Sequence, residues 1–220
     1  MVALTTGVPT IALLCGGSLV SQRTILTAAH CLYTTDITAE LVRAFVGTNR
    51  LDSNGTFYDL IPRSVIHPDY IPDVKLNDIA VVFTTTNVLF NDFVRPITLD
   101  FSFVSPGVLV KVAGWGRYSM SYKKVLQELT TTVLDGKECK ARWPTTPFNP
   151  NTEICTFRAT GYGFCYGDSG SALTRVDNGQ QIGIVSWMKP CARGYPDIYV
   201  RISSMQTWLE KFVTPITYYE

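Results

Sequence analysis

Few side chains in this sequence could act as a general base, because it contains only two histidines. His30 follows the strand-like run 25–29 and precedes Cys31, and His67 lies in a turn-like Ile-His-Pro-Asp segment. Imidazole suits proton transfer near neutral pH. Taken singly, each histidine is more typical of a structural or exposed residue, so a catalytic interpretation requires other residues.

A serine and an aspartate meet that requirement. Ser169 lies in a Gly-Asp-Ser-Gly tetrad, where a tight turn would expose its hydroxyl and direct backbone N–H groups toward an oxyanion. The tetrad alone is more typical of an ordinary turn. Asp78 directly precedes the apolar run 79–82. A carboxylate buried at that position is costly unless a donor such as a histidine N–H bonds to it. These residue types are those of nucleophilic acyl transfer.

Short strand-like runs bounded by turn residues would position these side chains. They span residues 18–21, 25–29, 42–47, 78–84, 108–113, 126–134 and 181–187, with no repeat of fixed period. Such spacing predicts antiparallel sheets, closed into barrels or stacked as a sandwich. The best linker, at 96–106, divides the chain into two all-β halves, residues 1–100 and 101–220.

One helix is predicted near the end of the chain. Ser203 and Gln206 have the spacing of a capping box. The apolar residues around them lie at the spacing of one helix face: Met205, Trp208, Leu209 and Phe212.

Composition excludes several classes of protein. The 220 residues are 46% hydrophobic, enough to bury a core as one large domain or two small ones. A net charge of +1 gives no electrostatic basis for binding nucleic acid or an anionic membrane. The apolar stretch 1–17 lacks a basic amino-terminal region, so we expect it to be mature structure rather than a signal peptide.

Six cysteines, an even number, indicate three disulfides in an oxidising compartment, with their pairing left open by the residues themselves. None lies in a Cys-x-x-Cys pair, which disfavours a zinc site. Asn54 begins the only N-glycosylation acceptor, in a turn-rich stretch.

The chain resembles the secreted serine endopeptidases of the chymotrypsin and trypsin type, and among them most nearly the arthropod chymotrypsin-like enzymes. The resemblance covers nearly the whole chain. Each motif is weak alone, but their order and spacing are specific. They are Cys15-Gly16-Gly17-Ser18-Leu19, Leu26-Thr27-Ala28-Ala29-His30-Cys31, Asn77-Asp78-Ile79-Ala80, Arg95-Pro96-Ile97, Gly114-Trp115-Gly116, Cys165-Tyr166-Gly167-Asp168-Ser169-Gly170, Ile184-Val185-Ser186-Trp187 and the closing helix.

This resemblance implies an all-β fold: two six-stranded antiparallel β-barrels with a C-terminal helix, and an active site in the cleft between the barrels. Ser169 would attack the scissile carbonyl, His30 would take its proton and pass it to the leaving amine, and Asp78 would hold the imidazole tautomer. The N–H groups of Gly167 and Ser169 would form the oxyanion hole. In Ser186-Trp187-Met188, the serine would bond the buried acid and the segment would pair with substrate backbone.

The family pattern also implies a substrate preference. Gly163 matches the base of the primary pocket, where trypsins have an aspartate, so a tryptic preference is not expected. Asp197 matches a second floor position that could accept a basic side chain. Bulk at Met188 and Phe164 would narrow the pocket, which favours a chymotrypsin- or elastase-like preference for medium or small apolar residues.

The same pattern selects one cysteine pairing and implies no metal or cofactor. The set of acidic residues that would form the calcium loop of some members is not evident in the stretch 47–58. His67 falls in a surface turn. The implied disulfides are Cys15 with Cys31, Cys139 with Cys155 and Cys165 with Cys191.

Two features depart from the family pattern. Ser171-Ala172 follows the nucleophile turn where the family has Gly-Pro, which would strain the cleft if the backbone required a glycine conformation there. In the family, an α-amine released from a zymogen pairs with the acid matching Asp168. No matching segment precedes Cys15, so we expect this chain alone to be inactive or zymogen-like, because a buried carboxylate without its partner is unfavourable.

Three interpretations follow: a secreted peptidase whose precursor carries further segments, a catalytically silent protease homologue that acts as a binding or regulatory module, or a structural extracellular β-protein. The intact His30, Asp78 and Ser169 favour the enzyme. We then expect a secreted, extracellular monomer, for example in a gut lumen. Its partners would be protein or peptide substrates and protein protease inhibitors, with no nucleic acid or membrane.

Overall fold

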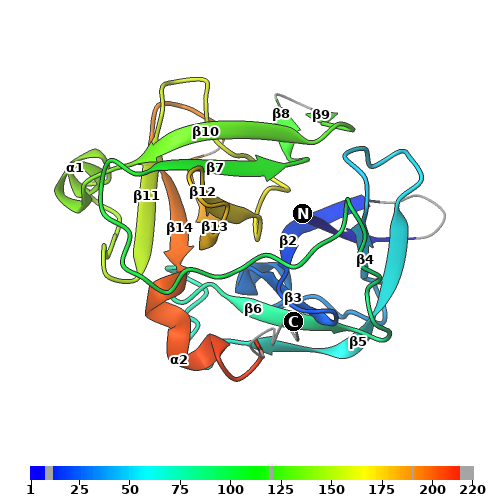
Figure 1. Cartoon of the computed structure of the whole chain (residues 1–220). Helices are drawn as coiled ribbons and strands as arrows, with labels where there is room; N and C mark the ends of the chain where they lie inside the picture. Colours follow the sequence, from blue (N-terminus) through cyan, green and yellow to red (C-terminus); the bar gives the residue numbers. More distant parts are fainter. Residues whose placement is uncertain (8–11, 119–120, 190, 214–220) are drawn as a thin grey trace.

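The computed structural model describes residues 1–7, 12–118, 121–189 and 191–213. Its strands form two closed six-stranded barrels with antiparallel neighbours, which confirms the predicted fold class. In Figure 1 the first barrel runs from blue to cyan and the second from green to orange. The strands of each barrel come from one half of the chain, while a division at residue 100 stays a prediction.

The first barrel has the strand order β1-β2-β3-β6-β5-β4. Within the apolar stretch 1–17, residues 2–6 and 12–17 lie on β1 and β2 and so belong to the folded barrel, as expected. The strands are β1 (Val2–Thr6), β2 (Ala12–Leu19), β3 (Thr24–Thr27), β4 (Arg43–Val46), β5 (Thr56–Ile66) and β6 (Ala80–Thr84).

The second barrel has the order β10-β11-β14-β13-β12-β7, and a separate two-stranded sheet pairs β8 (Arg117–Tyr118) with β9 (Ser121–Tyr122). Helix α1 (Gly136–Arg142) lies between β10 and β11 in the chain. The barrel strands are β7 (Leu109–Gly114), β10 (Gln127–Val133), β11 (Glu153–Phe157), β12 (Ala172–Arg175), β13 (Gln181–Trp187) and β14 (Asp197–Arg201).

The predicted carboxyl-terminal helix is present, but its predicted capping box is wrong. A 3-10 turn, η2 (Ile202–Met205), follows β14 directly and leads into α2 (Gln206–Leu209). Ser203 therefore lies inside a helical turn instead of preceding it, and no side chain in the described part of the chain caps α2. Trp208 and Leu209 are buried in the core of the first barrel, so the end of the chain returns to the half where it began.

Strand register brings the candidate residues of the first barrel together. Thr27 at the end of β3 lies opposite Ala80 at the start of β6. Because the two strands are antiparallel, the residues after Thr27 and those before Ala80 leave the sheet at the same edge. These segments carry His30 and Asp78.

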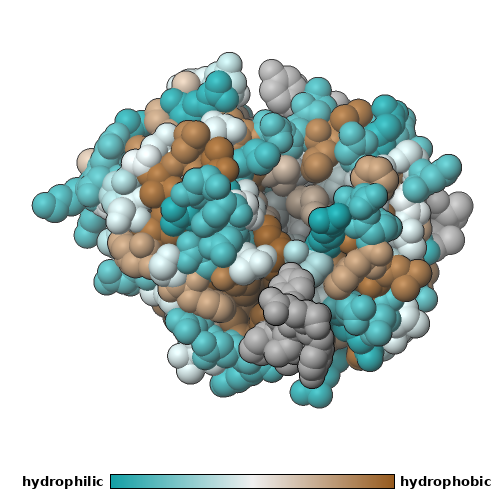
Figure 2. Space-filling view, in the orientation of Figure 1, coloured by the Kyte–Doolittle hydropathy of each residue, from teal (hydrophilic) through white to brown (hydrophobic). Residues whose placement is uncertain are grey.

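The surface in Figure 2 mixes hydrophilic and hydrophobic residues and is hollowed between the two halves of the molecule.

The three disulfides have the pairing that the family resemblance implies, and no described cysteine is free. They also tie neighbouring elements together: one joins β2 to the 3-10 turn η1 (Ala29–Cys31), and one joins α1 to β11. The pairs are Cys15–Cys31, Cys139–Cys155 and Cys165–Cys191. Among the described residues, no helix has the length and apolar character needed to cross a membrane.

Candidate active site

His30 and Asp78 form a closely bonded pair at the edge of the first barrel. His30 lies in η1, and its backbone N–H donates to Asp78 Oδ1 at 2.8 Å. Its Nδ1 lies 2.7 Å from Asp78 Oδ2. An ionised carboxylate can only accept, so this contact assigns the proton to Nδ1 and leaves Nε2 as a base.

Asp78 is fully buried, and three donors surround its carboxylate. Besides the two N–H groups of His30, Ser186 Oγ donates to Oδ2 at 2.6 Å. Ser186 lies on β13 of the second barrel, so the carboxylate bonds to both barrels. Buried charge is costly unless it is fully hydrogen-bonded, and these donors are what allow a carboxylate here.

Ser169 lies on a tight turn of the second barrel that contacts the first barrel. Gly167 and Gly170 have φ of 95° and 83°, the left-handed region that favours glycine. A side chain at Gly170 would collide with Thr27, and the backbone N–H of Gly16 donates to the Ser169 carbonyl at 2.7 Å. The turn is thus fixed against the strand that leads to His30. In the described part of the chain, no hydrogen bond joins Ser169 Oγ to His30.

The backbone of this turn leaves two donors unused. The N–H groups of Asp168, Gly170 and Ser171 donate to protein carbonyls. Within the described residues, the N–H groups of Gly167 and Ser169 have no protein acceptor. Unused donors on a turn beside a nucleophile are what an oxyanion requires.

Asp168 points away from the turn into a tight site made by two glycines. Its Oδ1 accepts from the Gly116 N–H at 2.7 Å, and its Oδ2 accepts from the Cys165 N–H at 2.9 Å. A Cβ at Gly114 or Gly116 would collide with the carboxylate. Burial raises the pKa of Asp168 to about 6, against the lowering effect of the two hydrogen bonds. A cavity of about 490 Å³ adjoins it, lined by parts of β7, β10 and residues 161–164.

Two of the predicted pocket residues, Gly163 and Phe164, lie beside a second buried acid, Asp197. Asp197 begins β14, is 5% exposed and accepts a hydrogen bond from the Phe164 N–H at 3.2 Å. A Cβ at Gly163 would lie 2.9 Å from its carboxylate, so only glycine leaves that space open. Burial raises the pKa of Asp197 to about 8, with Asp168 adding to the rise. Met188 is partly buried against the core of the second barrel.

Phe164 and Ser171 are both buried. The Phe164 ring packs edge to face on Tyr199 in the barrel core, and its effect on the width of the pocket stays a prediction. Ser171 does not have a positive φ, so its backbone does not require glycine. Its buried Oγ lies against Gly16 and has no hydrogen-bond partner among the described residues.

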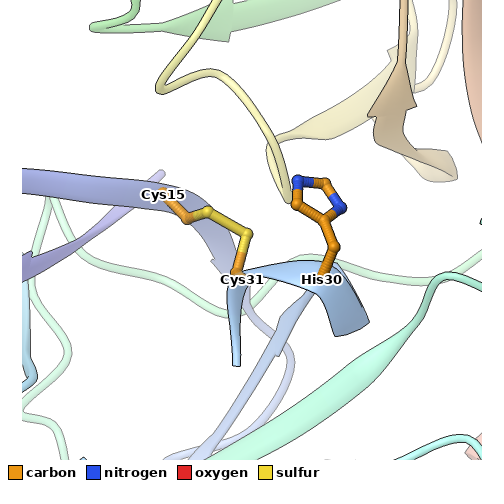
Figure 3. A group of neighbouring side chains, drawn as sticks. All are labelled: Cys15, His30 and Cys31. Atoms are coloured by element: carbon orange, nitrogen blue, oxygen red, sulfur yellow. A yellow bond between two sulfur atoms is a disulfide. The ribbon is translucent and has the colours of Figure 1, made fainter. Parts of the chain in front are cut away.

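Cys15, His30 and Cys31 form the one cluster of metal-binding residue types found among the described residues. Figure 3 shows the sulfur atoms of the two cysteines bonded to each other beside His30. Thiolates are therefore not available as ligands, and the cluster does not fit a zinc site.

Two other predicted features, His67 and Asn54, are not part of the hydrogen-bonded site described above. His67 packs on Trp208, and its Nδ1 accepts from the Asp69 N–H at 3.2 Å, which supports a structural role. Asn54 is exposed in a bend ahead of β5, and its glycosylation stays a prediction. Sequence reasoning missed Glu153, a buried acid that bonds the Trp187 indole. A lone glutamate at the start of an unrecognised strand gives no signal of such a contact.

Two barrels that share a buried aspartate, an oriented histidine and a serine turn have the architecture of the chymotrypsin-like serine endopeptidases. The model of the family described as Trypsin matches residues 1–209, and the chain belongs to this family.

Known arthropod proteins are similar to this chain over 90% of its length. Chymotrypsin-2 of Vespa crabro is 34% identical over 201 residues, covering 90% of this chain and 88% of that protein. Trypsin of Sarcophaga bullata is 32% identical over 206 residues, covering 90% and 78%. The clotting factor G beta subunit of Tachypleus tridentatus is 31% identical, covering 90% and 70%. Family membership thus makes this chain a serine endopeptidase homologue.

Proposed function

We propose that the protein is a secreted endopeptidase that hydrolyses peptide bonds through Ser169, His30 and Asp78. The observation that carries the proposal is the double hydrogen bond between His30 and a fully buried Asp78. Held this way, His30 Nε2 accepts the Ser169 proton as Oγ attacks the scissile carbonyl. The same proton then passes to the leaving amine, and water repeats the sequence to release the acyl group.

The unused N–H groups of Gly167 and Ser169 stabilise the oxyanion that forms during each attack. One such donor typically contributes about 3 kcal/mol to the transition state. Because both donors belong to the turn that contains Asp168, the position of that carboxylate controls them.

Asp168 and its adjoining cavity serve as the activation site in this proposal. Burial raises the pKa of Asp168 to about 6, so a cationic partner would stabilise its ionised form. An α-amine delivered into the cavity of about 490 Å³ is such a partner. We therefore propose that the enzyme is made as a zymogen and exported to an oxidising compartment, which three disulfides suit.

The primary pocket is proposed to prefer medium or small apolar side chains at neutral pH. Its floor has Gly163 in place of an acid, and the pKa of Asp197 is raised to about 8. Asp197 is thus largely uncharged at pH 7 and ionises as the pH rises through 8. A basic substrate side chain gains a charged partner only after that ionisation.

A panel of peptides that differ at the cleavage residue tests this function in the native, processed protein. We expect Leu- and Ala-directed peptides to be cleaved fastest at pH 7. The ratio of Lys-directed to Leu-directed kcat/KM should rise between pH 7 and pH 9, and Asp197→Asn should make that ratio independent of pH. A preference for Phe-directed peptides at pH 7, or a ratio that rises equally in Asp197→Asn, would overturn the proposed pocket chemistry.

A further inference from the structure

A buried carboxylate without a role in the proposed mechanism lies behind the substrate-binding segment. Glu153 begins β11 and is 7% exposed. Its Oε1 accepts a hydrogen bond from the indole Nε1 of Trp187 at 2.9 Å, and its Oε2 accepts one from the Asn149 N–H at 2.8 Å. Each oxygen therefore has a donor, and one donor belongs to the segment proposed to bind substrate.

The Trp187 indole is held from a second side by another aromatic ring. Trp143 packs edge to face on it with ring centroids 5.0 Å apart. Trp143 is itself fixed, because its Nε1 donates to the Pro196 carbonyl at 3.2 Å and its ring packs on Tyr195. The pairing of β13 with β14 is irregular at this end of β13, because its register shifts between Val185 and Trp187. Side-chain contacts must therefore set the direction of the indole.

Burial of the Glu153 carboxylate costs free energy, so its contact with Trp187 indicates a role beyond packing. Burial raises the pKa of Glu153, and the hydrogen bonds from Asn149 and Trp187 lower it. Among the described residues, no cation lies within ion-pair distance of Glu153. An apolar side chain would fill the position at lower cost but could not accept the indole N–H. Glu153 also lines a cavity of about 450 Å³ with the charged residues Asp135, Lys137, Lys140 and Arg201.

We infer that Glu153 is a positioning residue, which fixes the Trp187 indole and thereby the wall along which substrate backbone binds. The inference rests on the proposed peptidase function, with the segment 186–188 pairing with substrate backbone as the family resemblance implies. Glu153 itself touches no reacting atom in this scheme. Its loss should therefore weaken substrate binding and leave the chemical step nearly unchanged.

Steady-state kinetics of the native, processed protein with an extended peptide substrate test the inference. Glu153→Leu, which removes the acceptor, should raise KM about tenfold with kcat within about twofold. Glu153→Gln keeps an acceptor oxygen and should recover most of the KM. Glu210→Leu, a matched change of an exposed glutamate, should leave both constants unchanged. An unchanged KM in Glu153→Leu, or a fall in kcat with constant KM, would overturn the inference.

The indole N–H resonance of Trp187, identified by its loss in Trp187→Phe, provides a readout that needs no turnover. In the wild-type protein this resonance should move as Glu153 titrates, and in Glu153→Leu it should be displaced and independent of pH. Identical pH behaviour in the two proteins would contradict the contact. A protein with a titrating resonance and no peptidase activity would instead contradict only the proposed function.

Discussion

Asp78→Asn is expected to lower kcat about 10⁴-fold with little change in KM, the magnitude that the same change has in a well-studied protease of this family. Both carboxylate oxygens of Asp78 accept from His30, one from its backbone and one from Nδ1. An asparagine amide can present an N–H where Nδ1 needs an acceptor, which favours the imidazole tautomer that has its proton on Nε2. His30 then cannot accept the Ser169 proton.

Asp69→Asn is a matched control, because Asp69 is an exposed aspartate in a turn that, like Asp78, precedes β6 in the chain. Its activity should stay within about twofold of wild type, as for most exposed substitutions. Both variants should keep the wild-type midpoint of thermal unfolding to within a few degrees if the other hydrogen bonds around residue 78 persist. An Asp78→Asn protein that retains a tenth of the wild-type kcat would exclude the proposed role of Asp78.

Removal of the Cys15–Cys31 disulfide is expected to cost both stability and activity. The bond closes a loop with a sequence separation of 16, which corresponds to about 3 kcal/mol of unfolding free energy in the chain-entropy description. It also joins β2 to η1, the turn that carries His30. The Cys15→Ala/Cys31→Ala variant should therefore unfold at lower urea concentration and lose at least about tenfold in kcat/KM, since a misplaced general base slows proton transfer steeply.

The Cys139–Cys155 disulfide provides the control, because it has the same sequence separation of 16 and joins α1 to β11 instead. Its double alanine variant should lose similar stability but keep kcat within a few-fold under folding conditions. The comparison uses kcat because Cys139 and Cys155 pack against Trp187, so KM can change in this variant. Urea unfolding followed by tryptophan fluorescence and peptidase assays in parallel compare the two. Equal losses of activity would show that His30 does not depend specifically on its neighbouring disulfide.

Several strands of both barrels and the residues of the candidate site follow from local sequence pattern. The run 181–187 coincides with β13, and the run 42–47 contains β4. The acid ahead of an apolar strand and the histidine after another were recognisable separately. Their contact depends on the pairing of β3 with β6, which is a long-range property that neither segment encodes alone.

Strands whose side chains break the expected pattern escaped prediction. In β5, Pro62 interrupts the run, and the pairing with β6 shifts register between Leu60 and Ser64, where a proline is tolerated. In β14, Asp197 and Arg201 are both 5% exposed. Charged residues in a sequence favour the prediction of a loop, but these two are buried in the second barrel. Tertiary contacts decide these cases, and the same is true of Glu153.

The most direct test of the account is whether an active-site serine phosphonylating reagent modifies the native, processed protein at Ser169. Peptide mapping by mass spectrometry should locate one adduct on Ser169. Ser169→Ala should carry none, and His30→Ala should react at least about a hundredfold more slowly, because general-base assistance is lost. A native protein that stays unmodified, or is modified only at another serine, would contradict catalysis by Ser169.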